Sequence, residues 1–125
     1  MERIPASFPN ASFSDAVVAS GPGRWVMVSG QVGFGDDGKI VPGGLGAETS
    51  ATFDHIERAL SKAGGNLSHV VKLTVFLTDL SDYATFSALR KERFGDTLPA
   101  SSAVGVKELL VGAQIEMDAV AFIPE

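Results

Sequence analysis

Apolar residues recur along the chain at two different spacings, and the change of spacing marks the expected elements. Over residues 71–77 every second residue is apolar, which is typical of a β-strand with one buried face. Over residues 47–63 the apolar positions are three to four apart, which predicts an amphipathic helix ended by a pair of glycines. A second helix with the same spacing is expected to follow a cap at Asp79 or Ser81 and to end at Gly95.

The rest of the chain contains shorter apolar runs. Residues 14–19 and 25–29 are rich in valine and are separated by a Gly-Pro-Gly segment, which predicts a β-hairpin. Two last strands are expected near residues 101–106 and 114–122. Residues 1–12 contain prolines and small polar residues and are expected to form an irregular lead-in.

The expected order of elements is β-β-α-β-α-β-β, with a glycine-rich loop over residues 33–46. Two helices interleaved among about five strands bury their apolar stripes by packing on one face of a mixed sheet, so the fold class is α+β. The chain of 125 residues suits a single domain, residues 1–125. Because no third helix is expected to cover the other sheet face, identical subunits are its natural partner.

Composition narrows the classes of function. The 10 basic and 15 acidic residues give a net charge of −5, which opposes binding to nucleic-acid phosphates. With no cysteine and only two histidines at unrelated positions, no metal site is expected. The sequence shows no signal core and no membrane-spanning run, so a cytoplasmic protein without a membrane partner is expected. The surplus of 45% hydrophobic over 20% charged residues is attributed to buried subunit interfaces.

Four stretches of the sequence are similar to one known family of small proteins. They are Ser29-Gly30-Gln31, residues 70–80, residues 98–106 and residues 112–121. Together they resemble the RidA (YjgF-type) family, known for hydrolysing reactive enamines and imines. The resemblance runs from about residue 13 to residue 122 and implies a homotrimer with a chorismate-mutase-like fold that uses neither metal nor cofactor.

The resemblance also implies a cleft between subunits in which a positioned water attacks a small imine or enamine. Glu116 falls where the family has a glutamate that orients the water and assists proton transfer. Its alternative is a solvated acid on a strand face. Ser29 and Gly30 match a part of the cleft at a strand end, and the plainer explanation for them is a strand-terminal turn.

Four further positions match the cleft but depart from the usual residue. Phe13 keeps an apolar wall and lacks the hydroxyl of the tyrosine found in many members, and Ser87 replaces an asparagine. Ala103 replaces a cysteine whose backbone carbonyl, still present here, faces the catalytic water. Ser101 stands where deaminating members have an arginine that grips a substrate carboxylate, a contact of about 1.5–3 kcal/mol that a neutral hydroxyl does not reproduce.

The missing arginine leaves two interpretations open. The candidate replacements, each otherwise expected to be a solvated surface charge, are Arg24, Lys72, Arg90 and Lys107. With such a replacement, or with a less acidic substrate, the protein is an enamine or imine deaminase of altered substrate range. Without one, it is a trimer that has lost deaminase activity and serves as an interaction module or binds a small ligand, such as an imine, an enamine or a related carbonyl compound. RNA cleavage, a historical label for similar proteins, conflicts with the acidic balance.

Overall fold

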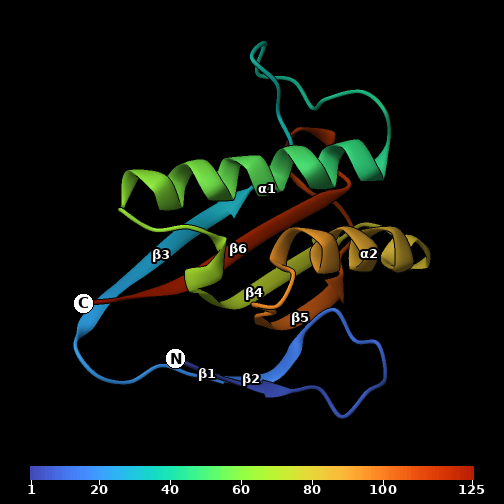
Figure 1. Ribbon diagram of the computed structural model, residues 1–125. Helices are drawn as coiled ribbons and strands as arrows, with labels where there is room; N and C mark the ends of the chain where they lie inside the picture. The colour runs from blue at the N-terminus through green and yellow to red at the C-terminus, as the bar shows by residue number, and fades with distance from the viewer.

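The computed structural model describes residues 1–125, and its strands form one mixed sheet that carries two helices on one face (Figure 1). The strands are β1 (Glu2–Pro5), β2 (Ser14–Val18), β3 (Gly23–Gln31), β4 (Val70–Leu77), β5 (Ala100–Gly105) and β6 (Ile115–Pro124). The helices are α1 (Leu45–Lys62) and α2 (Tyr83–Phe94), and single 3-10 turns span Leu67–His69, Leu80–Asp82 and Leu110–Gly112. The predicted α+β class is confirmed.

The sheet has six strands in the order β1-β2-β5-β4-β6-β3. β4 is parallel to β5 and antiparallel to β6, so it is a central strand. Leu73, Val75 and Leu77 of β4 are buried beneath the helices, as the period-two pattern predicts. The residues between them in sequence point to the opposite, open face of the sheet.

Both predicted helices form with their apolar stripes against the sheet. In α1, Phe53, Ile56 and Leu60 are fully buried. Gly64, at φ +87°, ends α1, which confirms the glycine stop. The expected cap of the second helix is placed differently, because Asp79 caps the short 3-10 turn Leu80–Asp82 that precedes α2.

Two expectations about the first thirty residues are wrong. The supposed irregular lead-in contains β1, which pairs antiparallel with β2. The supposed hairpin of residues 14–19 and 25–29 does not form, because β2 pairs with β1 and β5, whereas β3 pairs with β6. The physical reason is that β6 offers β3 an antiparallel partner along most of its length.

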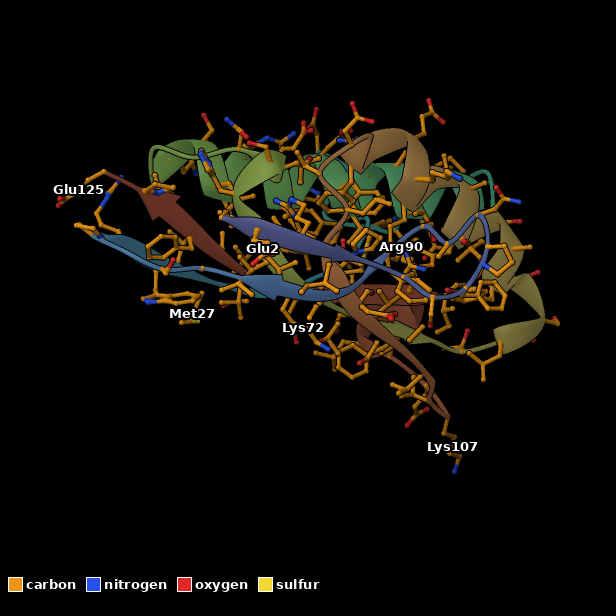
Figure 2. All side chains as sticks on the ribbon, turned by 60° about the horizontal axis from the view of Figure 1, so that its bottom comes forward. Glu2, Met27, Lys72, Arg90, Lys107 and Glu125 are labelled. Atoms are coloured by element: carbon orange, nitrogen blue, oxygen red, sulfur yellow. The ribbon has the colours of Figure 1, made fainter.

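The sheet face away from the helices remains uncovered in the single chain. Met27 is 69% exposed and Trp25 is 55% exposed, and Val104 is exposed on the same face. Figure 2 shows Met27 and Lys72 on this side, opposite the helices. Neither helix combines the length and apolarity needed to cross a lipid bilayer.

Candidate functional site

Helix α2 places an arginine inside the protein. Phe86, Arg90 and Phe94 lie four residues apart, so they share the face of α2 that packs toward the sheet. Arg90 is only 1% exposed, and Figure 2 shows it in the layer between the helices and the sheet. The expectation of a solvated surface charge is therefore wrong for Arg90. The sequence signal that identifies it is its position within the apolar stripe of α2.

Hydroxyl groups accept the hydrogen bonds of the Arg90 guanidinium. Nε and Nη2 both donate to Ser12 Oγ, at 3.0 and 2.7 Å. Nη1 donates to Ser101 Oγ at 2.8 Å, and Nη2 also donates to the Tyr83 hydroxyl at 2.6 Å. Neither Ser12 nor Tyr83 was among the predicted site residues, and for Ser12 the reason is that nothing in the sequence relates the lead-in to α2.

Arg90 has no acidic partner in the chain. The ion pairs of the protein join a different arginine, Arg93, to Asp54 and Glu57. The Arg90 Cζ instead lies 4.7 Å from the ring centroid of Phe86, with two further aromatic rings within 6 Å. Burial lowers the pKa of Arg90 from its ordinary value, although the guanidinium stays charged at neutral pH.

Three of the residues predicted from the sequence lie around this arginine. Ser101 contacts it directly, and the ring centroid of Phe13 is 5.5 Å from Arg90 Cζ. Ser87 joins through Ser12, whose Oγ lies 2.7 Å from Ser87 Oγ. We call this set the arginine group, and its members are Ser12, Phe13, Tyr83, Ser87, Arg90 and Ser101.

Strand β5 leaves one edge free beside the arginine group. β2 pairs with β5 at a single position, Ser14 with Ala100, so from Ser101 onward β5 has no strand partner on that side. Ala103 follows two residues after Ser101 and points to the same side of the sheet, because Ser101 pairs with Leu73 and Ala103 with Val75. Backbone polar groups near Ala103 are therefore accessible to a ligand or a second chain.

The remaining predicted residues form a second cluster at the end of β3. The register between β3 and β6 shifts between Val28 and Gln31, so Ser29 and Gly30 lie in a bulge. A Cβ at position 30 would lie 2.5 Å from Glu116 Oε2, so the glycine lets the backbone approach this carboxylate. We call Ser29, Gly30 and Glu116 the glutamate group.

The arginine group and the glutamate group lie on opposite faces of the sheet. Ser101 pairs with Leu73, whose side chain is buried under the helices. Glu116 pairs with Phe76, which points to the open face. Strand β4 also separates β5 from β6. One chain therefore does not bring Glu116 and Ser101 into a common cleft.

The other candidate cations and the surface hollows do not form a second binding site beside the arginine group or the glutamate group. Lys72 donates to Ser102 Oγ at 3.0 Å on the open face, and Arg24 and Lys107 are exposed. A hollow of about 580 Å³ lies on the outer side of α1 and is lined only by polar or small residues, including Arg58, whereas one of about 210 Å³ adjoins Phe13. No three acidic or histidine side chains are placed to hold a metal ion.

The fold and the two groups define a class of small α+β proteins with a two-helix layer on a mixed sheet and polar residues at the ends of its inner strands. Residues 4–123 match the family model described as Endoribonuclease L-PSP. A rat protein named 2-iminobutanoate/2-iminopropanoate deaminase is 36% identical over 120 residues, which are 95% of this chain and 84% of the rat protein. The chain belongs to the RidA family.

Solved structures agree with this membership. RidA from an Antarctic Psychrobacter species superposes with a TM-score of 0.77 at 32% identity, over 97% of this chain and 94% of that protein. Yeast Mmf1 superposes with the same TM-score of 0.77 at 28% identity, over 98% of this chain and 94% of that one. The fold expected from the sequence resemblance is thus confirmed.

Proposed function

We propose that this protein is a homotrimeric enamine or imine deaminase whose clefts are completed between subunits. The observation that carries the proposal is the placement of the arginine and glutamate groups on opposite faces of one sheet. Only a second copy can bring a glutamate group against an arginine group. Relatives named imine deaminases support the reaction.

The open sheet face supports assembly from identical subunits. Trp25, Met27 and Val104 expose apolar surface there, and the two helices lie on the other side. Exposed large apolar side chains on a sheet face that no helix covers favour a protein contact, and soluble homo-oligomers are closed and symmetric. Burial of this face in a trimer would also explain why the chain has 45% hydrophobic and only 20% charged residues.

The proposed reaction needs one water molecule and no electron transfer. The Glu116 carboxylate orients the water and takes its proton as the oxygen bonds to the carbon of the C=N group. The electron pair of the C=N π bond goes to the nitrogen, which takes that proton from Glu116. The new hydroxyl then passes its proton to the nitrogen through the same carboxylate, the carbon–nitrogen bond breaks, and ammonia leaves as the carbonyl product forms. An enamine enters the same route after a proton moves to its carbon. Phe13 provides an apolar wall that limits access of bulk solvent.

The test measures the rate at which an imine disappears and ammonia is released. An amino-acid oxidase generates the imine, and purified protein is added. We expect acceleration over the buffer rate, and we expect Glu116→Gln to lower it by about 100-fold. Asp118→Asn is the matched control, because Asp118 lies two residues further on the same face of β6. Absence of acceleration on a broad imine panel would reject the deaminase.

The replacement of the family's arginine by Ser101 favours a second candidate, a trimer that binds a small ligand without turnover. Introducing Arg at position 101 alone would bring two guanidinium groups together, because Arg90 already contacts Ser101. The informative variant is therefore Ser101→Arg combined with Arg90→Met. Imine hydrolysis that appears only in this double variant would identify the natural protein as the non-catalytic form.

A further inference from the structure

We propose that Arg90 of α2 supplies the positive charge of the site and delivers it through the Ser101 and Ser87 hydroxyls to a small carboxylate ligand. This inference rests on the proposed function and names its ligand class. The family resemblance implies that the positive charge lies at position 101 on β5. The inference places it instead on helix α2. Arg90 acts as a positioning residue, since its guanidinium is covered within the chain.

The first step concerns the buried charge. A buried ion without a partner of opposite charge is costly in free energy, and Arg90 is buried with no carboxylate beside it. Hydroxyls and aromatic rings solvate it in part. Its four hydrogen bonds leave one of the five N–H groups without an acceptor. An anion near this cluster would complete the electrostatic balance.

The second step concerns the direction of the hydrogen bonds. A serine hydroxyl has two lone pairs and one hydrogen, and both lone pairs of Ser12 Oγ face Arg90 N–H groups. Ser12 must therefore donate its hydrogen to Ser87 Oγ. Ser101 Oγ also accepts from Arg90, so its own hydrogen points elsewhere. Ser87 and Ser101 are thus left as free donors, each joined to the cation by hydrogen bonds.

The third step concerns access. Ser87 and Ser101 are partly exposed, whereas Arg90 and Ser12 are buried. From Ser101 onward the β5 edge beside this partly exposed residue also has no strand partner. Hydrogen bonds polarised by a cation are stronger donors than isolated hydroxyls. Two such donors, Ser87 on α2 and Ser101 on β5, both linked to Arg90 by hydrogen bonds, favour a carboxylate over a neutral group of the same shape.

The experiment compares two stable product-like probes, pyruvate and pyruvamide, by calorimetric titration of the full chain. They differ in charge and hardly in shape. We expect the natural protein to prefer pyruvate, and we expect Ser101→Ala to reduce that preference by about tenfold. Ser101→Thr retains a hydroxyl and should restore it. Lys91→Met removes a neighbouring exposed charge from α2 and should leave the preference unchanged.

Arg90→Met is expected to abolish the preference for pyruvate while pyruvamide still binds. If this variant fails to fold, Ser101→Ala and Ser87→Ala decide the matter, because both leave Arg90 in place. Equal binding of the two probes by the natural protein, or an unchanged preference in Ser101→Ala, would overturn the inference. Titration needs no turnover, so Arg90-dependent preference without imine hydrolysis would reject only the proposed function. Hydrolysis without that preference would reject only the inference.

Discussion

Glu48 and Gln114 are joined by two hydrogen bonds, from the Gln114 backbone N–H to Glu48 Oε1 at 2.9 Å and from its side-chain amide to Oε2 at 2.7 Å. Glu48 lies in the first turn of α1 and is 2% exposed. Gln114 directly precedes β6, the strand that carries Glu116. The pair therefore fixes the helix layer to the start of the strand that holds the proposed base.

Truncating this buried carboxylate should destabilise the protein. Glu48→Ala leaves two partly buried N–H donors of Gln114 without their acceptor, so we expect a loss of about 3 kcal/mol in the free energy of unfolding. Urea unfolding measures it. Glu92→Ala, at an exposed position of α2, is the control and should change the free energy by less than about 0.5 kcal/mol. Equal losses in the two variants would contradict the role given to Glu48.

Adding a methyl group at position 30 should affect activity more than stability. In Gly30→Ala the new Cβ meets the end of the Glu116 side chain, which can swing away at little cost. We therefore expect a stability change below about 1 kcal/mol and a fall in imine hydrolysis of at least about tenfold. Parallel measurements of urea unfolding and ammonia release separate the two effects. Retention of full activity would argue against Glu116 as the base.

A charge on the open sheet face should prevent assembly. Met27→Glu places a carboxylate where the proposed trimer buries apolar surface, and desolvating that charge costs several kcal/mol. Sedimentation velocity should show a trimer for the natural protein and a monomer for the variant. Ala88→Glu changes the charge on the exposed side of α2 and should remain trimeric. A natural protein that sediments as a monomer would remove the intersubunit cleft.

Removing the Ser12 hydroxyl should destabilise the protein, because Arg90 is a buried cation that depends on this acceptor. Ser12→Ala deprives Arg90 of the acceptor for two N–H groups, so we expect a loss of about 2 kcal/mol in the free energy of unfolding. Ser20→Ala, at an exposed position between β2 and β3, provides the comparison and should be close to neutral. A neutral Ser12→Ala would mean that water replaces the hydroxyl, and that Arg90 is less isolated than its burial indicates.

The turn before α2 should weaken in acid. Hydrogen bonds from the Ser81 hydroxyl and backbone N–H lower the pKa of Asp79 below its usual range. Its contribution to stability is therefore present above about pH 4 and is lost as the pH falls through the lowered folded-state pKa. The difference in melting temperature between the natural protein and Asp79→Ala should shrink in that window. A difference independent of pH would contradict the carboxylate cap.

The sequence predicts the elements whose burial pattern is local. Alternation over β4 and the spacing of Phe53, Ile56 and Leu60 follow from which side of each element is buried. β1 is missed because its four residues include Glu2, Arg3 and Pro5, and show no alternation. The pairing of β3 is missed because partner choice depends on contacts distant in sequence.

Part of the site was predictable from the sequence, and the part that was missed again depends on contacts between distant segments. Phe13, Ser87 and Ser101 follow from family resemblance, and the structure gathers them around one arginine. Arg90 itself was expected at the surface, because charged residues are rarely fully buried. Its four-residue spacing from Phe86 and Phe94 is a local signal, but its burial also depends on hydroxyls contributed by distant segments, above all Ser12, which no local pattern reports.

Through the side chain of Arg3, the first residues of the chain help to hold the arginine group in position. Its guanidinium donates to the carbonyl oxygens of Leu98 at 2.9 Å and Ser68 at 2.6 Å, and so fastens β1 to the segments that lead into β5 and β4. β1 in turn holds β2, whose first residue follows Ser12 and Phe13 directly. Removing or tagging the first residues would therefore loosen Ser12 and Phe13 beside Arg90. An inactive preparation of such a variant would then reflect the altered N-terminus and not the chemistry of the natural protein.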